Sequence, residues 1–145
     1  KAGAKAFLEA LAPPGVAVTL ATATDREVIL AGLRRTSLLP LLDKVFTCGD
    51  LGVDKRTPTI FHTARAAMGT ALETLVFEDA VHAAQTAYQA GYRVAGVADP
   101  YSDQKALQAT CHLYLSDLTD FPGFMRGSNS GNWKLPHPIW VGQFL

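Results

Sequence analysis

Short apolar runs alternate with amphipathic segments along the first 115 residues. Apolar side chains recur at helical spacing in residues 3–11, whereas residues 16–21 form a nearly continuous apolar run, typical of a strand buried on both faces. The same alternation predicts further strands at 44–47, 74–77, 93–97 and 112–115, and helices at 26–33, 38–42, 57–68, 80–90 and 103–109. Strands and helices in this order predict an α/β fold: a three-layer, Rossmann-like parallel sheet with helices on both faces.

The pattern changes near residue 121. Residues 127–132 have the composition of a flexible linker, and residues 133–145 are apolar and aromatic, with prolines at 136 and 138. We therefore predict a core domain over residues 1–120 and a linker and tail over residues 121–145. We expect the tail to be an appended segment, and its two tryptophans to favour self-association if they are exposed.

The charge balance excludes several classes of partner. The chain has 13 Lys and Arg against 13 Asp and Glu, so no long-range field would gather nucleic acid or an anionic membrane. No apolar run reaches the length of about 18 residues that spans a bilayer. Cys48 and Cys111 are too few for a disulfide framework, which favours the cytoplasm. Cys48 is not expected to act as a nucleophile, because the sequence offers no recognisable His or Asp partner for it.

Polar residues follow three of the predicted strands. Thr22 and Ala23 come after the first strand, Lys55 lies in the loop after the second, and Glu78 and Asp79 follow the third. In open parallel sheets, ligands bind at the carboxyl ends of the strands, so these residues should share one edge. Taken singly, each has a structural alternative: a turn threonine, a solvated lysine, or an aspartate that caps the next helix.

Together these residue types fit phosphoryl transfer. A hydroxyl and backbone N–H groups near a helix start can hold phosphate oxygens. A lysine supplies a point charge for the transferring group. Adjacent carboxylates can hold Mg²⁺, a hard ion that usually takes only one or two protein carboxylates and keeps several waters.

Three segments resemble motifs of the haloacid dehalogenase-like (HAD) phosphatases, in the branch that contains β-phosphoglucomutase. They are residues 20–24 (LATAT), 54–61 (DKRTPTIF) and 76–80 (VFEDA), within a resemblance that covers residues 3 to about 118. The resemblance implies phosphate binding by Thr22, Ala23 and Lys55, with Lys55 also catalytic. It implies Mg²⁺ binding by Glu78 and Asp79.

The family's first motif, an Asp-x-Asp at the end of a central strand, does not occur in these 145 residues. By resemblance, one of its aspartates attacks phosphorus and the other is the general acid and base. We therefore expect a HAD core that lacks its first central strand and its cap, begins inside a longer natural protein, and has no turnover alone.

Loss of a central strand would leave two rows of unpaired backbone groups, between residues 16–21 and 74–77. We expect a third strand between them, from the tail, another chain or another segment. The tail can contribute only after Pro138, because proline is disfavoured in a central strand.

The function that these features favour is an enzymatic one. It is Mg²⁺-dependent hydrolysis or transfer of the phosphoryl group of a small phosphorylated metabolite, such as a sugar phosphate, by way of an aspartyl-phosphate. The alternative is a non-catalytic HAD-like binding or assembly module.

Overall fold

The computed structural model describes residues 1–11, 16–69, 74–119 and 139–142. The helices are α1 (Ala4–Leu11), α2 (Arg26–Arg35), α3 (Cys48–Leu51), α4 (Thr59–Met68), α5 (Val81–Gln89) and α6 (Gln104–Thr110), with a 3-10 turn, η1 (Leu39–Leu41). The strands are β1 (Ala17–Thr22), β2 (Lys44–Thr47), β3 (Thr74–Glu78), β4 (Arg93–Val97), β5 (Leu113–Leu115) and β6 (Ile139–Gly142). The predicted α/β fold is confirmed. Within the described ranges, no helix is both long and apolar enough to cross a membrane.

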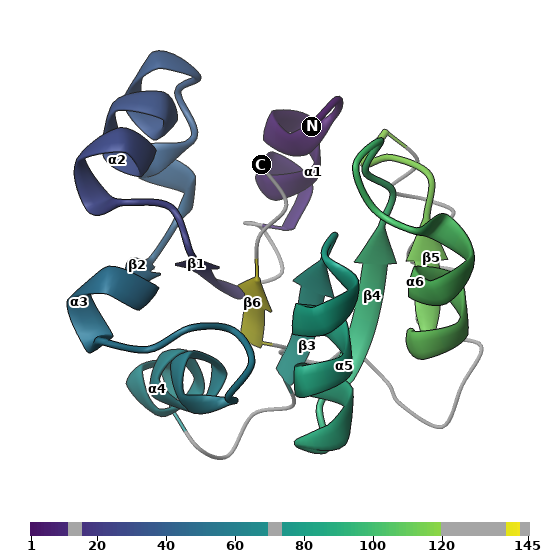
Figure 1. Cartoon of the computed structure of the whole chain (residues 1–145). Helices are drawn as coiled ribbons and strands as arrows, with labels where there is room; N and C mark the ends of the chain where they lie inside the picture. The colour runs from purple at the N-terminus through teal and green to yellow at the C-terminus, as the bar shows by residue number, and fades with distance from the viewer. Residues whose placement is uncertain (12–15, 70–73, 120–138, 143–145) are drawn as a thin grey trace.

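The strands form one parallel sheet in the order β2-β1-β6-β3-β4-β5. Helices cover both faces: α1 and α2 pack on one, and α4 and α5 on the other (Figure 1). Alternate residues of β3 supply the two halves of the core, because successive side chains of a strand point to opposite faces. Leu75 and Phe77 pack with α1, whereas Val76 packs with α4 and α5. The ring of Phe7 in α1 meets the Phe77 ring edge-on, with 5.8 Å between centroids.

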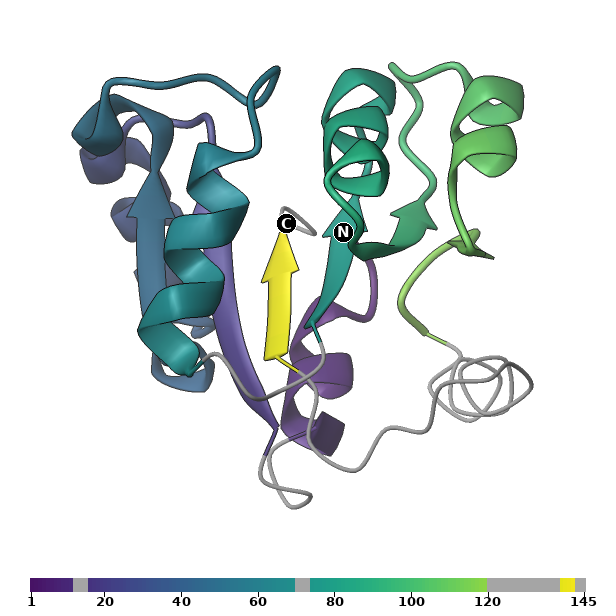
Figure 2. The ribbon, with the colours of Figure 1, turned by 90° about the horizontal axis from the view of Figure 1, so that it is seen from below.

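The slot between β1 and β3 is filled by β6, which comes from the end of the chain (Figure 2). Val141 is in register with Thr19 of β1 on one side and with Val76 of β3 on the other. The prediction of a third strand in this slot is therefore confirmed. Of the sources that the sequence left open, the structure has the tail residues after Pro138, so residues 139–142 are part of the sheet.

One element was missed by the sequence analysis, which predicted only a loop between the strand at 44–47 and the helix at 57–68. Residues Cys48–Leu51 form the short helix α3, and the Thr47 side chain caps it by accepting a hydrogen bond of 3.1 Å from the Asp50 backbone N–H. The helix ends at Gly52, whose left-handed conformation (φ of 66°) suits a residue without a Cβ. This turn directs the chain toward the loop that carries Lys55.

Candidate functional site

The predicted site residues lie where strands end. Thr22 is the last residue of β1 and Glu78 is the last residue of β3, and the two strands flank β6 in a parallel sheet. Asp79 follows Glu78 directly, and Lys55 lies in the loop between α3 and α4. We call this side of the sheet the carboxyl edge. In Figure 2 it is the edge toward which the arrowheads point.

Lys55 and Glu78 form a buried ion pair at the carboxyl edge. Lys55 Nζ lies 2.5 Å from Glu78 Oε1, and the two side chains are only 3% and 1% exposed. Nζ also lies 5.8 Å from the centre of the Phe61 ring. Burial raises the pKa of the Glu78 carboxyl, and the positive charge of Lys55 opposes this shift. The pair joins the second and third of the three segments picked out in the sequence.

The second carboxylate oxygen of Glu78 is an orphan. Oε2 is buried and has no hydrogen-bond partner in the described part of the chain. An unpaired buried acceptor is costly, and it commonly marks a functional position or an absent ion or water. This atom therefore has the capacity to accept from a ligand that enters the site.

Thr22 is fully buried, and its hydroxyl has a local partner. Thr22 Oγ1 accepts a hydrogen bond of 3.0 Å from the backbone N–H of Thr24. Accepting leaves the hydroxyl proton free to donate to an anion. Ala23, the next residue, is exposed, in the bend between β1 and α2. Thr22 thus ends β1, and Ala23 lies in the bend that leads to α2.

Asp79 contacts a residue that the sequence analysis missed. The Lys1 ammonium lies 3.1 Å from Asp79 Oδ2 and 2.8 Å from Asp99 Oδ2. It also donates to the backbone carbonyl of Ala98 at 3.2 Å. Burial by itself would lower the pKa of Lys1, but hydrogen bonds to Asp99 and Asp79 outweigh burial and raise it. The hydrogen bond from Lys1 in turn lowers the pKa of Asp99.

Asp99 could have been found from sequence, and Lys1 could not. Asp99 lies in the loop that follows β4, after Ala98, so a search of the residues that follow each strand would include it as it includes Asp79. Lys1 reaches the site only because the start of the chain folds back beside the end of β3, where Figure 2 places the N-terminus. No sequence pattern near Lys1 predicts that contact.

The donor set at this edge fits a magnesium ion. No group of three or more His, Cys, Asp or Glu side chains is arranged to hold a metal within the described ranges. Mg²⁺ needs fewer, because one or two carboxylates suffice when waters complete its shell. Asp79 provides a partly exposed carboxylate, and the residue before it, Glu78, provides the orphan oxygen.

Cys48 also lies near the carboxyl edge, at the start of α3. Burial raises the pKa of its thiol, and the nearby charge of Lys55 only partly opposes this. A protonated thiol is a poor nucleophile. That Cys48 is not a nucleophile stays a prediction.

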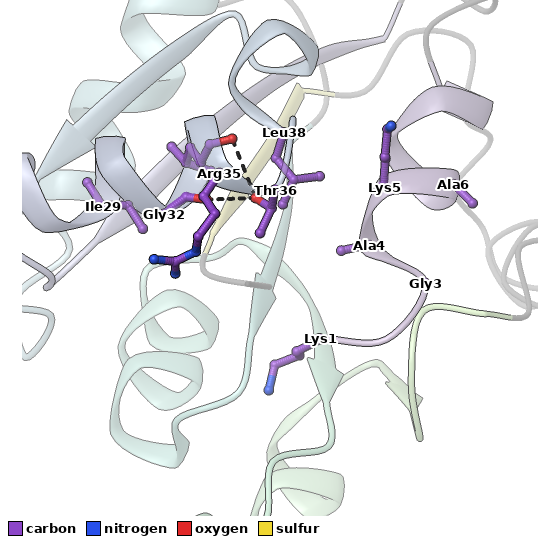
Figure 3. Close-up of a pocket in the computed structure, with 11 residues that line it drawn as sticks. Lys1, Gly3, Ala4, Lys5, Ala6, Ile29, Gly32, Arg35, Thr36 and Leu38 are labelled. Carbon is purple, nitrogen blue, oxygen red and sulfur yellow. Dashed lines mark hydrogen bonds between the residues drawn. The ribbon is translucent and has the colours of Figure 1, made fainter.

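A cavity of about 550 Å³ opens between α1 and α2 (Figure 3). Much of its lining is apolar and includes Ala4, Ile29, Leu33 and Leu38. Lys1 also lines it, so one side chain borders both the cavity and the acidic pair. Its volume is in the range of small-molecule sites.

Comparisons with known proteins agree with this architecture. A family model described as haloacid dehalogenase-like hydrolase matches residues 1–91, which is more than half of the chain. Among curated proteins, no match is found. The chain is similar to the crystal structure of a putative beta-phosphoglucomutase from Thermotoga maritima, with a TM-score of 0.76 and 24% sequence identity. That match covers 87% of this chain but 59% of the other, so the chain spans less than two thirds of that protein's length.

Proposed function

The chain belongs to the haloacid dehalogenase-like hydrolases, and on this basis we propose that its carboxyl edge is a Mg²⁺-dependent phosphoryl-transfer site. The substrate we propose is a small phosphorylated metabolite, such as a sugar phosphate. The observation that carries the proposal is the convergence of Thr22, the Lys55–Glu78 pair and Asp79 on one edge of a parallel sheet. The similarity to a putative beta-phosphoglucomutase supports the sugar-phosphate class.

In this proposal, Thr22 and Lys55 bind the phosphoryl group. The Thr22 hydroxyl proton and the backbone N–H of Ala23 donate to phosphate oxygens at the start of the segment that leads into α2. The Lys55 ammonium neutralises charge on the transferring group. Its pairing with Glu78 fixes the ammonium, so no side-chain ordering is needed when phosphate binds.

Asp79 and Glu78 hold the metal in this proposal. Mg²⁺, when bound, would neutralise negative charge on the phosphoryl oxygens and help to orient them. The Asp79 carboxylate and Glu78 Oε2 would be the oxygens available to hold it, because Glu78 Oε1 is already held by Lys55.

The attacking group is not among these residues. The sequence contains no Asp-x-Asp, and we propose that this motif belongs to a segment outside these 145 residues. Attack by its aspartate would break the P–O bond to the metabolite, release the metabolite as an alcohol and form an aspartyl-phosphate. Water would then hydrolyse this intermediate to free phosphate and aspartate. The cytoplasm is the compartment we propose, since both cysteines are free thiols.

One observation favours a second candidate, a non-catalytic binding or assembly module. In the family, by resemblance, the strand with the attacking aspartate takes the central position that β6 fills here between β1 and β3. A chain that fills this slot with its own end could retain phosphate binding without chemistry.

Release of phosphate from an aryl phosphate tests the enzymatic proposal. The 145-residue chain should show none above background, with or without Mg²⁺. A longer protein that joins these residues to an Asp-x-Asp strand should turn over, and Asp79→Asn should raise the Mg²⁺ concentration that it requires. Turnover by the 145-residue chain that survives further purification would contradict the proposal. So would a longer protein whose metal requirement ignores Asp79→Asn.

A further inference from the structure

The Lys1 ammonium is seated among three oxygen atoms at the carboxyl edge. These are Asp99 Oδ2 at 2.8 Å, Asp79 Oδ2 at 3.1 Å and the Ala98 carbonyl oxygen at 3.2 Å. The Lys1 side chain is 12% exposed, and those of Asp79 and Asp99 are 15% and 24% exposed. An ordinary surface ion pair has one partner and is far more exposed. In the pair of Lys5 and Glu9, for example, Nζ lies 4.0 Å from Oε1 and both side chains are more than half exposed.

Backbone contacts of the residues next to Lys1 hold it in place, in addition to the contacts of its own side chain. The Leu118 backbone N–H donates to the Ala2 carbonyl at 3.3 Å, which holds the start of the chain against the segment after β5. Gly3 has a φ of 82°, and a Cβ there would lie 2.7 Å from the Leu118 carbonyl carbon. A glycine is therefore required at this close approach, and the packing of Gly3 against Leu118 sets the position of the Lys1 backbone.

We propose that Asp79, Asp99 and the Ala98 carbonyl form one cation site, whose resident occupant is the Lys1 ammonium, and that a divalent metal at Asp79 must displace Lys1. This inference rests on the proposed metal role of Asp79 and adds Asp99 as a further residue of that site. Carboxylate and carbonyl oxygens are the donors that hard divalent ions take. Glu78, the residue before Asp79, adds a separate observation that points to a ligand: its Oε2 is buried and has no hydrogen-bond partner among the described residues.

Charge and distance both favour exchange. Two carboxylates against one ammonium leave a net charge of −1 with Lys1 in place, and a divalent ion in its stead neutralises the pair. The three oxygens lie 2.8–3.2 Å from Lys1 Nζ, which are hydrogen-bond distances. Mg²⁺ requires its oxygen ligands at about 2.1 Å. Both cations therefore cannot occupy the site at once.

The displaced side chain has space to enter. Lys1 lines the cavity of about 550 Å³ between α1 and α2, where Figure 3 shows it at the side opposite Leu38. A rotation of the Lys1 side chain into this cavity would free Asp79 and Asp99 without unfolding α1. The contact thus acts as a built-in competitor that sets the metal concentration at which the site fills.

Amine labelling of the full chain tests the contact itself. A brief pulse of an N-hydroxysuccinimide acetyl ester, read by peptide fragmentation that separates the Lys1 Nζ from its α-amino group, should label Lys1 several-fold more slowly than Lys5. Asp99→Asn should abolish this protection, and saturating Mg²⁺ should abolish it in the unchanged chain. Equal labelling of Lys1 and Lys5 without metal would overturn the proposal.

Calorimetric titration with Mg²⁺ tests the competition. Lys1→Gln should bind Mg²⁺ about tenfold more tightly than the unchanged chain, whereas the matched control Lys5→Gln should not differ from it. Mg²⁺ binding that is equal in all three would overturn the competition and leave the metal role of Asp79 intact. No Mg²⁺ binding even by Lys1→Gln would overturn both, so the two failures are distinguishable.

Discussion

Replacing Lys55 by methionine isolates the energetics of the buried ion pair. Methionine nearly matches the aliphatic part of lysine, so apolar packing against Phe61 changes little while the charge is lost. Glu78, only 1% exposed, then keeps a carboxylate without its ammonium partner. Removing one partner of a buried pair typically costs about 3–5 kcal/mol, because the remaining charge is buried and uncompensated.

The pH dependence of this loss follows from the pKa of Glu78. Burial raises that pKa above its ordinary value, and Lys55 is the charge that opposes the shift, so Lys55→Met should raise the pKa further. The folded state then binds a proton that the unfolded state releases above about pH 4.5, and stability falls as pH rises through the folded pKa. The destabilisation at pH 8 should therefore exceed that at pH 5.

Urea unfolding followed by circular dichroism measures the effect at both pH values. With a total stability of about 5–15 kcal/mol, the variant should still fold at pH 5. Lys55→Met combined with Glu78→Leu should recover most of the loss, since no buried charge remains. The control Lys5→Met, at an exposed position, should cost less than about 0.5 kcal/mol. A loss below about 1 kcal/mol that is equal at pH 5 and pH 8 would refute this account of the pair.

Two further predictions concern the sheet. Gly96→Ala should lower the free energy of unfolding, measured with urea, by about 1–3 kcal/mol, because the added Cβ would meet Cys111 Sγ at 2.8 Å and Leu107 Cγ at 3.1 Å. The control Gly49→Ala, whose Cβ would have nothing within 4 Å, should be neutral or slightly stabilising. Equal losses in the two variants would refute the packing argument. Val141→Pro should lower the free energy of unfolding by about 2–4 kcal/mol, since proline removes a hydrogen-bond donor from a strand that is paired on both sides. An unchanged urea midpoint would show that β6 contributes little to stability.

Local sequence patterns were sufficient to predict much of the fold. Strands 44–47 and 93–97 were predicted with the bounds that the structure has. For residues 94–97 the signal is the apolar run itself, because this strand is buried on both faces. The convergence of Lys55 on Glu78 was also predictable, since loops that follow parallel strands share an edge. The short helix α3 was missed, although Thr47 and Asp50 have the spacing of a helix cap.

Long-range pairings were beyond the reach of these patterns. Residues 139–142 lie between β1 and β3 because the backbone groups of these two strands would otherwise be unpaired in the middle of the sheet. The seat of Lys1 depends on a contact between residues 98 positions apart, fixed by the close approach of Gly3 to Leu118. Neither arrangement leaves a periodic signal in the neighbouring sequence.

The binding of inorganic phosphate to the chain tests the central claim most directly, because it requires the site and does not require the attacking aspartate. Calorimetric titration near pH 7 should show binding in the presence of Mg²⁺. Thr22→Val, which removes the hydroxyl and keeps the shape, should weaken it about tenfold, and Asp79→Asn should remove its dependence on Mg²⁺. Absence of phosphate binding, or binding that neither substitution alters, would contradict the assignment of the carboxyl edge as a phosphoryl-transfer site.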